Sequence, residues 1–66
     1  MAPVPADRSE LSSIATLLEQ LTTRISAMGE QAQVVKEDGL ASELFAVERA
    51  LVGAGRRINR LLGPSR

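Results

Sequence analysis

The sequence predicts an all-α fold, an antiparallel hairpin of two helices that packs like a coiled coil and pairs with a second hairpin into a four-helix bundle. Apolar residues recur at alternating intervals of three and four residues in two separate runs, which is the heptad pattern of helices that pack side by side. No segment shows the period of two that a half-buried strand needs. The heptad phase breaks once, at Asp38-Gly39, so two helices joined by a turn explain the pattern better than the alternative, one interrupted rod.

The two ends of the chain are expected to lie outside the helices. Residues 1–7 contain Pro3 and Pro5, each of which fixes φ and removes a backbone donor, so we expect a flexible, extended arm. Residues 63–66 begin with Gly63-Pro64. Glycine suits the position just after a helix and proline cannot continue one, so these residues are expected to form a tail.

The first helix is expected over residues 8–36. Asp7 and Glu10 have the spacing of a capping box, with the aspartate in the usual Ser/Thr position, and Ser9 is the competing N-cap. Gly29 is the one weak helix former and lies beside the heptad positions. The heptad positions that are expected to face inward are Leu11, Ile14, Leu18, Leu21, Ile25, Met28, Ala32 and Val35.

A turn over residues 37–39 and a second helix over residues 40–62 are expected to follow. Gly39 suits the left-handed position that ends a helix, and Asp38 can cap the helix that follows. These two uses compete, so the turn can shift by one or two residues. The expected inward positions of the second helix are Leu40, Leu44, Val47, Leu51, Ala54, Ile58 and Leu61.

The favoured register of the hairpin places Leu11 opposite Leu61 and Ile14 opposite Ile58, because every inward residue of the second helix then finds a partner. A register shifted by one heptad also matches the pattern but leaves Leu11 and Ile14 overhanging. It stays open as the alternative.

Two glycines, Gly53 and Gly55, fall within one turn of the second helix. Each costs about 1 kcal/mol relative to alanine. Their presence indicates either close contact with another backbone or a soft point in the helix.

A lone two-helix hairpin of this size has a marginal core, which indicates that further apolar surface is buried against another chain. Phe45 and Val52 are seven residues apart and share a helix face. The apolar residues off the heptad positions, expected to bind a second copy or a larger protein partner, are Leu17, Phe45, Val52 and Leu62.

The composition excludes most catalytic and metal chemistry. The 66 residues include no Cys, His, Trp or Tyr, so disulfides, zinc or haem ligation through these residues, and thiol or imidazole catalysis are ruled out. Glu37 and Asp38 form a carboxylate pair, but they lie at the expected turn with no pocket implied. We therefore expect no enzyme activity, no cofactor and no metal site.

Charge is segregated although the formal net charge is zero. Residues 1–48 carry eight acidic and three basic side chains, whereas residues 49–66 carry five arginines and no acid. At about 100° per residue, Arg49, Arg56 and Arg60 share one helix face, which is the candidate site for an anionic partner. The interpretation favoured over it is that cations near a helix C-terminus merely complement its dipole. The candidate anion-binding residues are Arg49, Arg56, Arg57 and Arg60.

These observations favour a non-catalytic helical interaction module, a regulator or adaptor that forms a homodimer or docks on a larger partner. The alternative is a small regulator that binds nucleic acid or a phosphorylated ligand through its arginines, although zero net charge makes nucleic acid a poor fit. The chain start has no pattern of a secretory signal and no apolar run spans a membrane, so a cytoplasmic location is expected. The excess of arginine over lysine indicates a GC-rich bacterial or phage genome.

Overall fold

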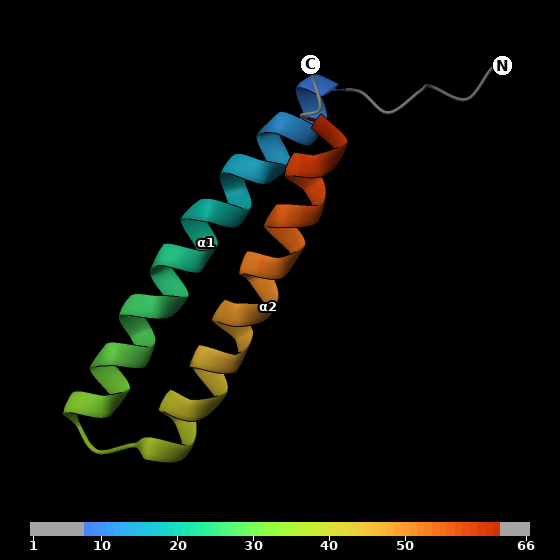
Figure 1. Ribbon diagram of the computed structural model, residues 1–66. Helices are drawn as coiled ribbons and strands as arrows, with labels where there is room; N and C mark the ends of the chain where they lie inside the picture. Colours follow the sequence, from blue (N-terminus) through green and yellow to red (C-terminus); the bar gives the residue numbers. More distant parts are fainter. Residues whose placement is uncertain (1–7, 63–66) are drawn as a thin grey trace, which may run out of the picture.

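The structure, a computed structural model, describes residues 8–62 as a hairpin of two helices. Helix α1 (Arg8–Val34) and helix α2 (Asp38–Leu62) run in opposite directions and pack against each other along their length (Figure 1). The predicted two-helix hairpin is confirmed, and the single rod is excluded. The arm and tail expected over residues 1–7 and 63–66, and the capping role of Asp7, lie outside the described residues.

The turn lies slightly earlier than expected and is closed by Lys36. The Lys36 amide donates to the carbonyl of Gln33 at 3.0 Å, and the Glu37 amide donates to the carbonyl of Ala32 at 2.8 Å. This pair of bonds is the Schellman motif, and Lys36 occupies its left-handed position with a φ of 65°.

Three expectations about helix ends are therefore wrong. Gly39 does not take the left-handed position, because it already lies in the first turn of α2. The Ala41 amide donates to the Glu37 carbonyl at 2.9 Å, so Glu37, not Asp38, stands at the N-cap position of α2. Ser9 lies inside α1 and is not its N-cap.

The face that each helix turns inward differs from the expected one. On α1 the side chains of Ile14, Leu21 and Met28 are exposed, as is that of Val35 just after its end. On α2 those of Leu40, Val47 and Leu61 are exposed. The residue after each of several of these positions is more buried instead, as at Ala15, Thr22, Gly29, Ala41, Glu48 and Leu62. Both helices are thus rotated relative to the heptad prediction, and only half of the expected positions face the partner helix.

Small residues near the turn explain the rotation. Among the described residues only Gly29, Ala32 and Ala41 are buried. Small side chains let two helices approach closely, and the ring of Phe45 fills the space beside Gly29. Gly29 is therefore a packing residue rather than only a weak helix former. The favoured register places Gly29 opposite residue 43 and the shifted one places it opposite residue 50, so the contact with Phe45 lies nearer to the favoured register.

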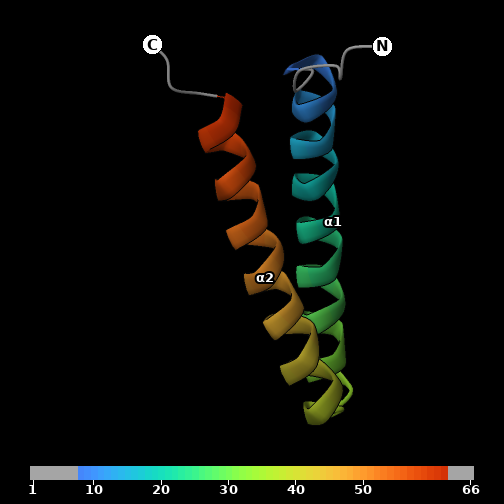
Figure 2. The same cartoon turned by 90° about the vertical axis from the view of Figure 1, so that its right-hand side faces the viewer.

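At the opposite end of the hairpin the inward residues Leu11, Ile58 and Leu62 are only half-buried. The Arg8 guanidinium donates a 2.7 Å hydrogen bond to the carbonyl of Leu62, which links the start of α1 to the end of α2. The two helices converge toward this end in one view (Figure 1) and separate toward it in the other (Figure 2), so they cross at an angle. A Cβ added at Gly53 or Gly55 would meet nothing within 4 Å, so these glycines do not mark a close contact with α1.

Within residues 8–62, neither helix combines the length and the hydrophobicity that a membrane crossing requires.

Candidate functional site

One exposed feature of the hairpin is a set of apolar side chains that the heptad pattern had predicted to face inward. Each of them is between 37% and 62% exposed. Together they form what we call the apolar face: Ile14, Leu21, Met28, Val35, Leu40, Val47 and Leu61.

Helical geometry places the apolar face on one broad side of the hairpin. On α1, Leu21 follows the inward residue Leu18 by three positions, and on α2, Val47 follows Leu44 by three positions. Three positions correspond to a rotation of about −60° in each helix. Because the helices are antiparallel, an equal rotation in both turns their side chains to the same side of the hairpin.

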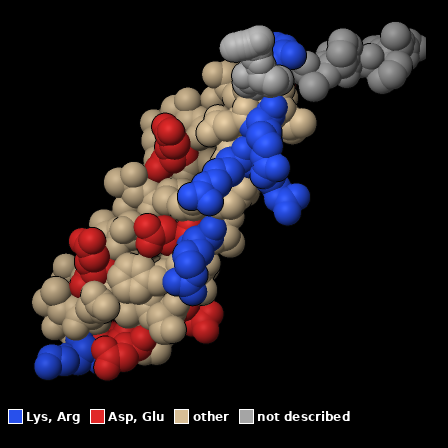
Figure 3. Space-filling view, viewed as in Figure 1, with Lys and Arg blue, Asp and Glu red and all other residues tan. Residues whose placement is uncertain are grey.

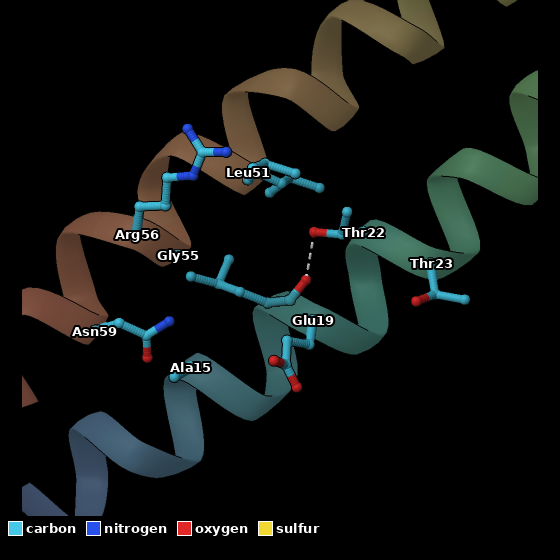
Figure 4. Close-up of a pocket in the computed structure, with 10 residues that line it drawn as sticks. Ala15, Glu19, Thr22, Thr23, Leu51, Gly55, Arg56 and Asn59 are labelled. Atoms are coloured by element: carbon cyan, nitrogen blue, oxygen red, sulfur yellow. Dashed lines mark hydrogen bonds between the residues drawn. The ribbon is translucent and has the colours of Figure 1, made fainter. Parts of the chain in front are cut away.

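The other broad side carries a groove between the helices. Its volume is about 460 Å³, and α1 contributes Glu19 and Thr23 while α2 contributes Val52, Arg56 and Asn59. Figure 4 shows that Arg56 and Glu19 extend in different directions. The groove is therefore an open surface with separated charges.

The hydroxyl of Thr22, on the α1 wall of the groove, is hydrogen-bonded to the backbone of its own helix. The Thr22 hydroxyl donates to the carbonyl of Leu18 at 2.6 Å, which is the usual way that a helical threonine satisfies its donor. Thr22 is therefore not poised as a nucleophile.

A second hollow of about 490 Å³ lies on α2 itself. The residues that line it are Phe45, Glu48, Arg49, Val52, Gly53 and Arg56. Figure 3 shows that basic side chains gather along α2 and that acidic ones lie along α1 and near the turn. The charge segregation in the sequence is therefore also a segregation in space.

The arginines of α2 have no ionic partners within the described part of the chain. Arg49, Arg56 and Arg60 are exposed, and none of them forms an ion pair with another described residue. Arg57 is also exposed, but it is rotated by about 100° from Arg56 and about 60° from Arg60, so it flanks the other three instead of lying in line with them. The three aligned residues Arg49, Arg56 and Arg60 are called the arginine stripe below.

The structure separates the four apolar residues that the sequence grouped as a partner-binding strip. Leu17 is three residues from Ile14 and four from Leu21, so it adjoins the apolar face. Phe45 and Val52 lie on the groove side, and Leu62 is half-buried at the open end of the hairpin. They do not form one continuous strip.

The heptad pattern did not predict the apolar face. It identifies the row of inward residues on each helix, but it does not say which of the two neighbouring rows packs against the other helix. The small residues Gly29, Ala32 and Ala41, together with the nearby Phe45, were the signal that could have shown it.

No cluster of potential metal ligands occurs among residues 8–62.

Comparisons with protein-family models, with curated proteins and with solved structures found no match to this chain.

Proposed function

We propose that this protein is a non-catalytic interaction module that self-associates through its apolar face. Two hairpins pack these faces together and form a four-helix bundle, which serves a regulator or adaptor role. The observation that carries the proposal is the apolar face itself, in which seven aliphatic side chains from both helices remain about half exposed on one side. A surface of this kind on a small chain is typical of a protein interface.

The size of the apolar face supports the same proposal. Burying the exposed half of each aliphatic side chain contributes about 1 kcal/mol, which favours association over the isolated hairpin.

Sedimentation equilibrium at micromolar concentration tests the proposal. The protein is expected to sediment as a dimer, and its melting temperature is expected to rise with protein concentration. The double variant L21K/V47K places two charges on the apolar face and is expected to be a monomer. A matched control, V34K/A46K, adds the same charges at exposed positions off the face and is expected to remain a dimer.

Circular dichroism separates lost association from lost folding, because a monomeric variant that keeps its helices has lost only the interface. A wild-type chain that stays monomeric with a concentration-independent melting temperature would overturn self-association. A monomer that captures another helical protein through Leu21 and Val47 would instead assign the apolar face to a larger partner.

The alternative function, a regulator that binds nucleic acid or a phosphorylated ligand, has one observation in its favour, the unpaired arginine stripe. Zero net charge and the absence of aromatic residues other than Phe45 count against nucleic acid. Phosphate contacts weaken steeply as salt increases. Binding of duplex DNA at physiological salt would therefore promote this alternative.

The proposed location of the protein is the cytoplasm of a bacterium, or of the host cell of a phage. This proposal rests on the composition of the chain alone.

A further inference from the structure

One side of α2 alternates apolar and basic residues at the spacing of a helix-docking surface. Phe45, Arg49, Val52 and Arg56 follow each other at intervals of four, three and four residues, and Arg60 continues the row four residues later. These intervals keep all five side chains on one helix face. We call these five residues the docking row: Phe45, Arg49, Val52, Arg56 and Arg60.

The docking row has room for another helix. Four of its residues, Phe45, Arg49, Val52 and Arg56, line the hollow of about 490 Å³ on α2, together with Glu48 and Gly53. Val52 and Arg56 also line the groove toward α1. Gly53 lines the hollow and Gly55 lines the groove, and at both positions the space where a Cβ would stand is open for 4 Å. The absence of side chains at these two positions leaves the hollow and the groove open.

The charges of the docking row are available for a partner. Arg49, Arg56 and Arg60 have no ionic partner among the described residues, although Glu19 lines the groove that Arg56 also lines. Glu19 is thus the charged residue of the α1 wall, and Arg56 is the charged residue of the α2 wall. A partner with carboxylates along one edge would be attracted to α2 and repelled by Glu19, which fixes how it lies in the groove.

We propose that the docking row binds an acidic amphipathic helix of a partner protein. Apolar residues of the partner, seven positions apart, pack on Phe45 and Val52. Carboxylates at the intervening heptad positions pair with Arg49 and Arg56, and one further carboxylate pairs with Arg60. Arginine suits this role, because its planar guanidinium binds carboxylates in a bidentate manner.

A helix fits this surface better than a nucleic acid does. Phe45 and Val52 interrupt the arginines with apolar surface, which a phosphate backbone cannot use. Glu19 lines the groove, and Glu48 lines the hollow itself. A uniformly charged phosphate backbone cannot avoid these carboxylates, whereas a helix can place its own carboxylates over the arginines alone. An amphipathic helix matches both the apolar and the basic positions of the row.

This site is independent of the proposed self-association. The apolar face lies on the opposite broad side of the hairpin, so a second copy bound there leaves the docking row open. Failure of dimer formation would not affect binding at the docking row, and the reverse also holds.

The test is a fluorescence-anisotropy titration of the full chain with a designed peptide of about 20 residues. The peptide carries leucines seven residues apart and glutamates at the heptad positions between them. A control peptide has the same composition, with its glutamates moved to the opposite face. The matched peptide is expected to bind at least about tenfold more tightly than the control.

Two protein variants with equal charge changes separate the docking row from general electrostatics. R49Q/R56Q removes two arginines of the row and is expected to weaken binding of the matched peptide about tenfold. R24Q/K36Q removes two exposed cations elsewhere and is expected to weaken it by less than about threefold. V52S, which removes the central apolar contact, is expected to weaken it severalfold at any salt concentration.

Three results would overturn the proposal. The first is failure of the matched peptide to bind, and the second is an equal loss in both charge variants. The third is a duplex DNA that displaces the peptide at physiological salt, with its own binding lost in R49Q/R56Q. This last result would assign the arginines to nucleic acid.

Discussion

The ring of Phe45 occupies the space where Gly29 would otherwise carry a side chain. A Cβ built on Gly29 would lie 2.7 Å from Cε1 and 2.9 Å from Cζ of that ring, which is closer than carbon atoms approach without displacement. The contact joins the two helices near the turn. It also fixes which side of each helix faces the other, and so which side is left open.

Replacing Gly29 with alanine is therefore expected to destabilise the hairpin. Alanine improves helix propensity by about 1 kcal/mol, but overpacking against the ring costs about 1–3 kcal/mol. We expect a net loss of about 1 kcal/mol in the free energy of unfolding, measured by urea titration.

The control for this prediction is the same substitution in an F45L background, where its effect on the free energy of unfolding is expected to differ. In the F45L background the ring is gone, so G29A is expected to be neutral or stabilising there. A stabilising effect of G29A in the wild-type chain would show that the ring moves aside at no cost.

Lys36→Gly is expected to stabilise the turn. A residue with a Cβ is destabilised by about 1–2 kcal/mol in the left-handed region, and glycine removes this cost. Glycine also gives the unfolded chain more conformational freedom, which offsets part of the gain in stability. We expect a net gain of about 0.5–1 kcal/mol. Thermal unfolding of K36G measures it, and Q33G, which places glycine inside α1, is expected to destabilise. A K36G variant that melts below the wild type would argue against the Schellman turn.

Gly53→Ala and Gly55→Ala are each expected to stabilise the chain by up to about 1 kcal/mol, because alanine is the better helix former and meets no atoms at either position. For a domain of this size, 1 kcal/mol corresponds to an increase of about 4–8 °C in melting temperature. G29A is the contrasting glycine variant, since its space is filled. A loss of stability in G53A or G55A would indicate that another chain occupies the open space.

Glu48→Leu is expected to stabilise the hairpin by about 1 kcal/mol. Glu48 lies at an inward heptad position between Ala41 and Gly55, is half-buried, and forms no ion pair with another described residue. An apolar side chain there gains burial that the carboxylate cannot use. The control is E43L, because Glu43 is exposed, and its unfolding free energy is expected to change little. Equal effects of the two changes would contradict the inward placement of Glu48.

The sequence was sufficient to predict the two helices and the hairpin, because the heptad spacing and its break at Asp38-Gly39 are local features. It was not sufficient to predict the rotation of the helices. A heptad pattern identifies Leu18 and Leu44 as inward, but whether Leu21 or Thr22 completes the packing face depends on how closely the backbones approach. The Phe45–Gly29 contact decides that, and it joins residues from different helices.

The candidate sites divide in the same way. The alignment of Arg49, Arg56 and Arg60 follows from helical geometry and could be predicted. That these arginines have no ionic partner in residues 8–62 required the relative placement of both helices, whereas the separate position of Arg57 also follows from helical geometry. The position of the turn also could not be predicted. The left-handed position at a helix end is usually a glycine, which pointed to Gly39, whereas the packing of α1 on α2 places it at Lys36.

The buried residues also bear on the order in which the chain folds. Gly29, Ala32 and Ala41 lie close to the turn, so the contacts among them close the shortest loop in the molecule and lose the least chain entropy. Folding is then expected to start at the Lys36 turn and to extend toward Arg8 and Leu62, within the microsecond to millisecond range of helical proteins with local contacts. Backbone amides near Ala32 and Ala41 are the last to exchange with deuterium, and those near the open end exchange first.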